Sequence, residues 1–474
     1  MMAGTMNATT SLSLEPLWLA SGLPEAALQH LTLTGLDPAL PSSFAVGTAA
    51  QTSLAAAALA ATQVGQYRNG LRQQVSVDMR HAALECCLRF SIDGRTPEPW
   101  DRIAGLYACG PNGDAGWVRL HTNFAHHRDG VLRLLGLPLG PQTPREAVAQ
   151  ALRAWAAVGF EEAATQAGLV VAALRTLDEW DRHPQSAAVA ERPLVDFEKI
   201  GDAPPLAWPA LPLAALPLQG LRVLDLTRIL AGPIGGRTLA AYGAEVMLVN
   251  SPHLPNIEAI IDTSRGKLSA LADLTTAEGR AGLQAVLRDA HVFIQGYRPG
   301  ALAAFGLSPE AVAQARPGIV MVSLSAYGET GPWAGKRGFD SLVQTATGLN
   351  HAEAQAAGSD QPKALPMQIL DMATGFLMAF GAQTALLRQQ ADGGSWHVRV
   401  SLARTAQWLR SLGRVEHGFE APAAGFSAVM QAYPSGYGAL LATRHAAQFS
   451  HTPAGWERPS VPPGTHPLAW PPAD

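Results

Sequence analysis

The sequence predicts an α/β protein with a parallel sheet, flanking helices and a smaller α+β lobe. Two observations carry this prediction. The second half of the 474-residue chain alternates short apolar runs with helical patterns, and the first half abandons this alternation after about residue 90. Alternating strands and helices are typical of βαβ units, whose strands pair in parallel. With 47% hydrophobic residues, the chain can bury large cores.

The elements of the second half are expected in a regular order. Strands are predicted at 222–226, 245–249, 291–294 and 319–324, and helices at 234–242, 277–288 and 308–314. Ser308 is the expected N-cap of the last of these helices, with Pro309 in its first turn. The series predicts a Rossmann-like sheet. A dinucleotide site has little support, because no Gly-x-Gly-x-x-Gly follows the first strand.

The first half opens with an alanine-rich stretch, 44–64, that is long enough to be compared with a membrane span. Its scattered Thr, Ser and Gln residues mean that transfer into lipid would gain little, so a buried helix is expected. Further on, 117–121 is a predicted strand. Thr143-Pro-Arg-Glu146 predicts a capping box that starts a helix ending near Trp155, and another helix is expected across 169–174. These elements predict the α+β lobe, at about 90–200.

A Pro/Ala-rich segment, 203–218, divides the chain near residue 215 into the parts 1–215 and 216–474. The parts share two patterns. Gln73-Gln-Val-Ser-Val-Asp-Met79 matches Trp396-His-Val-Arg-Val-Ser-Leu402, 323 positions later, and Pro205-Leu-Ala-Trp-Pro209 matches Pro467-Leu-Ala-Trp-Pro471, 262 positions later. Two matches in the same order predict an internal duplication in which each copy has lost a different piece. Chance similarity between two alanine-rich helix–strand units is the alternative.

Charge and cysteine content exclude several classes of function. The formal net charge is −4 and the pI is about 6.4, so nothing indicates nucleic-acid binding. Cys86, Cys87 and Cys109 form neither a Cys-x-x-Cys pair nor a disulfide framework, and no secretory signal is visible. A cytoplasmic protein that does not insert into a membrane is expected.

Asp371 is the first candidate for chemistry, because Ile369-Leu-Asp-Met-Ala-Thr-Gly375 presents one carboxylate at the mouth of an apolar helix. With an ordinary pKa of about 3.9 it is ionised at neutral pH and can attack a thioester carbonyl. Aspartate is also a preferred N-cap, and a helix over 372–387 would use it in that way. At the matching position of the first copy stands Thr48, which caps acceptably without a carboxylate. An acid kept only in the second copy favours a chemical role.

The second half also carries an ordered set of short motifs. They are Leu224-Asp-Leu-Thr-Arg228, Ala231-Gly-Pro233, Tyr242-Gly-Ala244, Arg265-Gly-Lys267, Arg298-Pro-Gly300, Ser325-Ala-Tyr-Gly-Glu-Thr-Gly-Pro332 and Gly338-Phe-Asp340. In this order and spacing they resemble the class III CoA-transferases, the family of formyl-CoA and carnitine CoA-transferases that also includes α-methylacyl-CoA racemase. The resemblance covers roughly 219–410 well and 73–200 more weakly.

The resemblance implies an enzyme that moves CoA from an acyl-CoA donor to a carboxylic acid, with Asp371 as nucleophile. A mixed anhydride and then an aspartyl-CoA thioester are the implied intermediates. CoA and acyl-CoA are substrates in this reaction, and no tightly bound cofactor is expected. The implied CoA contacts are Arg228, Arg265, Lys267, Tyr297, Arg298 and Tyr327, at the sheet edge where α/β folds place ligands. Arg298 and Lys267 are preferred, since neighbouring glycines let backbone approach a phosphate. A solvated charge or a packed crevice wall is the alternative for each.

Some positions depart from the family's pattern. Asn250 and the residues after it stand where an acidic residue and then basic ones are usual, and Ala304 replaces a common basic residue. A non-catalytic acyl-CoA-binding subunit is therefore an alternative. Phe339 replaces the histidine of the racemases, and phenylalanine cannot move a proton, so the alternative of an acyl-CoA racemase or isomerase is disfavoured. Asp340 is expected to bond to backbone rather than to substrate.

The remaining candidates have structural explanations. His121, His126 and His127 lack companions at zinc-like spacing, so a polar loop is expected and no metal site. In the family a glycine-rich loop covers the aspartate; Gly110-Pro-Asn-Gly113 is the nearest such turn here, and a solvated hairpin is expected instead. The family's site forms between the large domain of one subunit and the small domain of its partner. One chain of this protein is expected to supply both parts around Asp371, and a homodimer stays compatible with this arrangement.

Overall fold

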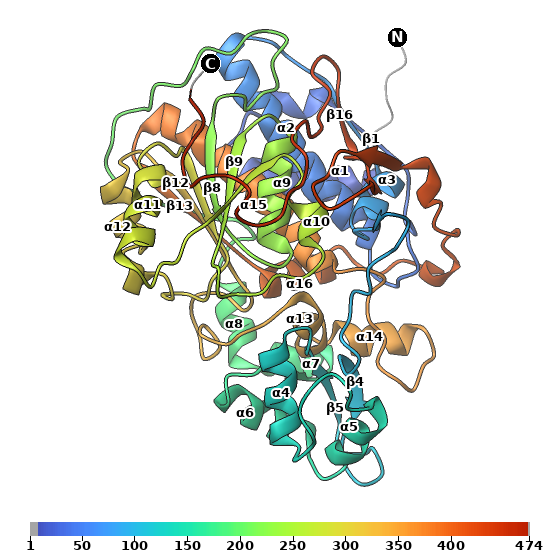
Figure 1. The fold of residues 1–474 in the computed structure, drawn as a ribbon. Helices are drawn as coiled ribbons and strands as arrows, with labels where there is room; N and C mark the ends of the chain where they lie inside the picture. The colour runs from blue at the N-terminus through green and yellow to red at the C-terminus, as the bar shows by residue number, and fades with distance from the viewer. Residues whose placement is uncertain (1–7, 473–474) are drawn as a thin grey trace.

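The computed structural model describes residues 8–472 (Figure 1). Its centre is a seven-stranded sheet with the order β10-β9-β8-β11-β12-β13-β7, in which only the β13–β7 pair is antiparallel. The strands are β7 (Asp196–Gly201), β8 (Arg222–Leu226), β9 (Glu245–Asn250), β10 (Lys267–Leu271), β11 (Val292–Gln295), β12 (Val320–Ser325) and β13 (Ser395–Ser401). The predicted α/β fold class is confirmed.

Both faces of the parallel strands are buried, which explains their near-continuous apolar runs. One side of the sheet packs on α11 (Ala277–Leu287) and α12 (Pro309–Ala315), and α9 (Ala231–Ala241) belongs to the core on the other side. Ser308 caps α12 as expected: its hydroxyl accepts a hydrogen bond from the Ala311 amide at 3.2 Å. The sequence thus places the βαβ elements of the second half within a few residues of their observed bounds.

Two 24-residue helices, α2 (Val46–Asn69) and α15 (Ile369–Asp392), pack against each other in the core. The buried helix expected across 44–64 is confirmed. α15 is long and apolar enough to cross a membrane, but its apolar window is entirely buried inside the fold. The two helices begin and end 323 positions apart, as do the starts of α3 (Met79–Glu85) and α16 (Leu402–Ser411). The internal duplication itself stays a prediction.

The division near residue 215 does not separate two independent bodies. β1 (Leu31–Thr34), β2 (Val75–Asp78) and β16 (Ala447–Phe449) share one sheet, and β3 (Phe90–Ile92) pairs with β15 (Leu440–Thr443), which pairs with β14 (Met430–Tyr433). A buried charge cluster also joins the halves, since Arg237 contacts Glu85 at 3.1 Å and also contacts Asp262. Burial alone would raise the pKa of Glu85, but His445 and Arg237 lower it to about 2.

The small lobe projects from the main body and is built on the antiparallel sheet β4-β5-β6 (Figure 1). Its elements are β4 (Gly105–Ala108), β5 (Trp117–Leu120), β6 (Val171–Ala173), α4 (Ala125–Leu134), α5 (Arg145–Leu152) and α6 (Ala157–Gln166). Two predictions fail here. Residues 169–174 contribute a strand rather than a helix, because Val171–Ala173 pairs with β5. Thr143 forms no capping box, because its hydroxyl donates to the Pro138 carbonyl and Pro144 is the N-cap of α5.

The remaining elements connect or flank these bodies. They are α1 (Ala8–Ala20), α7 (Leu177–Arg182), α8 (Pro184–Ala190), α10 (Ile260–Thr263), α13 (Asp340–Ala346), α14 (Leu349–Ala356) and the 3₁₀ turns Glu25–His30, Ala303–Phe305, Gly418–Glu420 and Phe426–Ala428. α13 packs against both β5 and β6 of the small lobe. It therefore links that lobe to the start of α15, where Asp371 lies.

Candidate active site

Asp371 lies in the first turn of α15, as the third residue of the helix. The interpretation of Asp371 as the N-cap is wrong: Gln368 is the N-cap, and the helix begins three residues earlier than expected. The reason is Asp340, whose Oδ2 accepts the Asp371 backbone N–H at 2.9 Å and so satisfies a donor that a cap would otherwise bind. Within residues 8–472, no hydrogen bond to the Asp371 carboxylate is found. Its carboxyl oxygens are thus left without a hydrogen-bond partner among the described residues.

The two carboxylates influence each other's ionisation. Burial raises the pKa of Asp371 well above its ordinary value, and the nearby charge of Asp340 raises it further. Burial also raises the pKa of Asp340, to about 7, even though hydrogen bonds from backbone and from Gln344 oppose this rise. The expectation of an ordinary pKa for Asp371 is therefore wrong. The expectation that Asp340 bonds to backbone is confirmed.

Two cavities meet at Asp371. The larger, of about 790 Å³, is called here the carbon-lined cavity after side chains such as Leu40, Phe90 and Trp100, although charged residues line it as well. The smaller, of about 530 Å³, is called the basic cavity after Arg228, Arg298 and Arg337. Both are lined by Asp371, Phe339, Ile229 and Leu230. Residues from before and after position 215 line each cavity.

The basic cavity opens at the carboxyl ends of β8, β11 and β12. It receives three of the predicted CoA contacts, Arg228, Tyr297 and Arg298. Lys336 and Arg337 also line this cavity, and the sequence motifs do not predict them. Their position directly before the Gly338-Phe-Asp340 motif is the feature of the sequence that could have indicated them. Lys336 is engaged by Glu161 at 2.8 Å. This edge of a parallel sheet is where α/β proteins bind ligands.

The other three predicted contacts are not brought to either cavity. Arg265 is buried in the charge cluster, where it donates to Asp262 at 2.5 Å. Lys267 is fully buried and donates to Asp225 Oδ2 and to the Pro233 carbonyl, both at 2.8 Å. Tyr327 is buried and packs edge-on against the Trp333 ring. The single glycine between Arg265 and Lys267 therefore serves the packing of the chain, because a Cβ on Gly266 would lie 2.6 Å from the Trp456 ring.

Aromatic side chains close the site from the small lobe. The His121 ring stacks on Phe339 with centroids 4.1 Å apart, and Trp100 packs edge-on against His121 at 5.8 Å. Burial and the neighbouring Arg119 lower the pKa of His121 to about 3, so its imidazole is neutral at physiological pH. The polar loop expected for the histidines is wrong for His126 and His127, which lie in α4, whereas His121 lies in a loop but is buried. Within residues 8–472 no cluster of His, Cys, Asp or Glu fits a metal ion.

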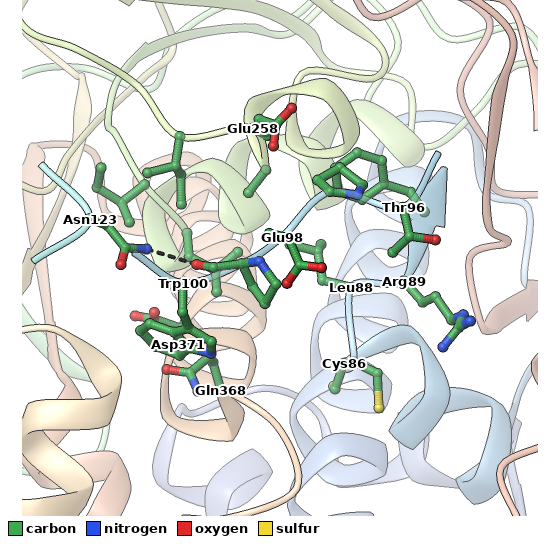
Figure 2. Close-up of a pocket in the computed structure, with 18 of the residues that line it drawn as sticks. Cys86, Leu88, Arg89, Thr96, Glu98, Trp100, Asn123, Glu258, Gln368 and Asp371 are labelled. Atoms are coloured by element: carbon green, nitrogen blue, oxygen red, sulfur yellow. Dashed lines mark hydrogen bonds between the residues drawn. The ribbon is translucent and has the colours of Figure 1, made fainter. Parts of the chain in front are cut away.

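The sequence motifs do not indicate that Trp100 and His121 lie at the site of Asp371. In Figure 2, Trp100, Gln368 and Asp371 gather on one side of the carbon-lined cavity, with Arg89 and Cys86 on the other. Residues 110–113, the glycine-rich turn, line neither cavity. No local pattern could show that the segment leading into the small lobe passes over the start of α15.

Parts of the chain are similar in sequence to known proteins. Residues 218–428 match the family model described as CoA-transferase family III. This match supports the predicted family and an enzyme of that class. An acyl-CoA transferase of Gibberella moniliformis is 28% identical over 69% of this chain and 64% of that protein. A succinate–glutarate CoA-transferase of Agrobacterium fabrum is 32% identical over 39% of this chain and 51% of that protein.

A solved structure is also similar to part of the chain. A CAIB/BAIF family protein from Brucella suis is 27% identical, with a TM-score of 0.38, over 48% of this chain and 65% of that chain. A probable fatty acyl-CoA transferase of Mycobacterium tuberculosis is 30% identical over 42% of this chain and 53% of its own length. This chain thus spans about half to two-thirds of the length of these curated relatives.

Proposed function

We propose that this protein transfers CoA from an acyl-CoA donor to a carboxylic acid, with Asp371 as the nucleophile. One observation carries the proposal: the buried carboxylate of Asp371, to which no hydrogen bond is found within residues 8–472, lies where a basic and a carbon-lined cavity meet. A thioester carbonyl placed at this junction has its CoA on one side and its acyl group on the other. The family match at 218–428 supports the same chemistry.

The basic cavity suits the CoA moiety, which carries several negative charges. Arg228, Arg298 and Arg337 line it, and among residues 8–472 no carboxylate other than that of Asp371 does so. Guanidinium groups bind phosphate with two parallel hydrogen bonds and keep their charge at any physiological pH. We assign the phosphates of CoA to this cavity. Arg265, Lys267 and Tyr327 are assigned to the fold instead.

The reaction proceeds in four covalent steps. A carboxylate oxygen of Asp371 attacks the acyl-CoA carbonyl, which gives a mixed anhydride and releases CoA thiolate. The thiolate attacks the aspartyl carbonyl, which gives aspartyl-CoA thioester and releases the donor acid. The acceptor carboxylate attacks this thioester and forms a second anhydride, and the thiolate then attacks the acceptor's acyl carbon. The product is a new acyl-CoA, and Asp371 is regenerated. Dividing the exchange into covalent steps lowers each barrier.

Burial serves this chemistry once Asp371 has lost its proton. A desolvated carboxylate has no water shell to shed before it attacks, so it is a stronger nucleophile than an exposed one. Asp340 acts as a positioning residue: it holds the first turn of α15 through the Asp371 N–H, and its charge raises the pKa of Asp371. Deprotonation of this coupled pair is expected to limit the rate at acidic pH.

The racemase alternative finds little support in the site. The position of the racemase histidine is occupied by Phe339, whose ring is covered by the neutral His121. The alternative of a non-catalytic acyl-CoA-binding subunit is distinguished by experiment. Asp371→Asn and Asp371→Ala should both abolish transfer and hydroxylamine-sensitive adducts, while CoA still binds. A binding subunit would form no adduct even in the wild-type protein.

The stoichiometry tests whether one chain builds one site. The wild-type protein, incubated with acyl-CoA and analysed by intact-protein mass spectrometry, should carry one CoA adduct per chain. Because the matching position in the first copy is Thr48, which is held by Asp37 at 2.7 Å, no second nucleophile is expected there. Two adducts per chain would contradict a single site around Asp371.

A further inference from the structure

The carbon-lined cavity is the larger of the two described cavities that Asp371 lines. Its volume of about 790 Å³ lies in the upper part of the range, about 300–1,000 Å³, of pockets that enclose drug-sized molecules. Its walls come from far-apart segments: residues 86–90, the connector 96–101 that leads into the small lobe, residues 256–259 and the turn at Phe426. The cavity is therefore enclosed by several parts of the fold, and Asp371, the proposed nucleophile, lines it.

The charges around this cavity disfavour a second carboxylate on the substrate. Glu98, Asp101 and Glu258 line it, whereas Arg89 is the one arginine or lysine that does so among residues 8–472. Arg89 is exposed and lies over the Phe426 ring at 5.0 Å. Glu258 is engaged by Arg95 at 2.5 Å. An anionic group in this cavity would thus meet like charges, and the cation Arg89 lies on the side of the cavity opposite Asp371.

The end of the cavity beside Asp371 is aromatic and neutral. Trp100 lines this end of the cavity with 37% of its surface exposed. The Arg119 guanidinium lies over the Trp100 ring, with its central carbon 4.7 Å from the ring centroid. His121 and Phe339 form the stacked pair next to it. Flat aromatic surfaces of this kind gain free energy by covering hydrocarbon rather than ionised groups.

We propose that this cavity binds the hydrocarbon part of the acid that exchanges CoA, and that this acid is a large apolar monocarboxylic acid rather than a short dicarboxylic acid. The inference rests on the proposed function, since it takes Asp371 as the point of reaction. It assigns the two cavities opposite tasks, because the basic cavity holds the charged CoA and the carbon-lined cavity holds the acyl chain.

A series of acyl-CoA thioesters tests the inference in the first half-reaction, which needs no acceptor. The rate of aspartyl-CoA formation is measured by rapid quench and mass spectrometry for acetyl-, butanoyl-, hexanoyl-, octanoyl- and decanoyl-CoA, with succinyl-CoA beside them. The value of kcat/KM should rise about fourfold for each added methylene group until the cavity is filled. Succinyl-CoA should react at least roughly tenfold more slowly than octanoyl-CoA.

Two matched variants locate the effect. Ala259→Phe narrows the carbon-lined cavity and should lower kcat/KM for decanoyl-CoA at least roughly tenfold while that for acetyl-CoA changes little. Ala301→Phe places the same bulk in the basic cavity and should lower the rates of all thioesters alike. Equal losses for every chain length in Ala259→Phe would overturn the assignment of this cavity to the acyl chain.

A binding measurement separates this inference from the proposed function. Calorimetric titration of Asp371→Asn with decanoate and with succinate should show binding of decanoate only. If no thioester yields an adduct but decanoate binds, the result refutes the proposed transfer reaction and supports the assignment of the cavity. If adducts form but succinyl-CoA reacts as fast as octanoyl-CoA, the transfer reaction stands and the assignment is overturned. Absence of both adduct and decanoate binding overturns both.

Discussion

Asparagine at position 340 should change how the stability of the protein depends on pH. Burial raises the pKa of Asp340 from 3.8 to about 7. A carboxyl whose pKa is raised in the folded state stabilises the fold below the pKa of the unfolded chain, and this stability is lost as the pH rises to the folded value. At about 1.4 kcal/mol per pH unit, ionising Asp340 costs on the order of 4 kcal/mol between pH 4 and pH 7.

The Asp340→Asn variant removes this cost. The asparagine amide faces the Gln344 side chain, which donates to the carboxylate in the wild type, so some stability is lost at every pH. The pH-dependent part is separate from this constant loss. Relative to wild type, the variant should gain on the order of 4 kcal/mol from pH 4 to pH 8, and the lowered pKa of Asp371 adds to the gain.

Urea unfolding at intervals between pH 4 and pH 8 measures this difference directly. Asp114→Asn, in the exposed turn of the small lobe, controls for removal of an unrelated carboxylate. The acid limb of adduct formation should also move to lower pH in Asp340→Asn, because the charge that raises the pKa of Asp371 is gone. A stability difference that stays constant over the whole range would refute the buried, coupled pair.

Three further substitutions test the assignments of individual residues. Lys267→Met should lower the free energy of unfolding by about 3–5 kcal/mol in urea unfolding, because Asp225 is left buried without its partner. The same variant should leave the KM for acyl-CoA unchanged in steady-state kinetics. Arg298→Gln should affect binding and not stability. It should raise the KM for acyl-CoA roughly tenfold at low salt and leave the midpoint of urea unfolding unchanged. Gly375→Ala should destabilise by about 1–3 kcal/mol in thermal unfolding, since its Cβ would lie 2.6 Å from the Ala231 carbonyl oxygen where α15 crosses α9; an unchanged midpoint would contradict this close packing.

The fold of the second half is largely predictable because its signals are local. The bounds of β8 match the predicted 222–226, and Ser308 caps its helix from within the same turn. The small lobe is less predictable, because tertiary contacts decide it. Val171–Ala173 forms a strand because the edge of β5 is available, and the Thr143 hydroxyl is drawn to Pro138. Neither partner is visible in the pattern of the segment itself.

The candidate site follows the same division. The sequence points to Asp371 through the motif around it, and to Arg228 and Arg298 through the ends of their strands. It misplaces Lys267 because the neighbouring Gly266 indicates a close approach without saying what approaches. Here the Trp456 ring approaches Gly266, and the Lys267 side chain pairs with the buried Asp225. Trp100 is invisible in the sequence, because its connector reaches α15 only through the folded lobe.

The fate of one oxygen atom tests the central claim most directly. In the proposed steps the acceptor carboxylate attacks aspartyl-CoA, and departure of the acyl group to CoA leaves one acceptor oxygen on Asp371. The protein is taken through a single turnover with an acceptor acid labelled in both carboxyl oxygens with oxygen-18, in unlabelled water, and the peptide containing Asp371 is sequenced by mass spectrometry. The account predicts one oxygen-18 atom on the Asp371 side chain. Complete turnover with an unlabelled Asp371 would contradict it.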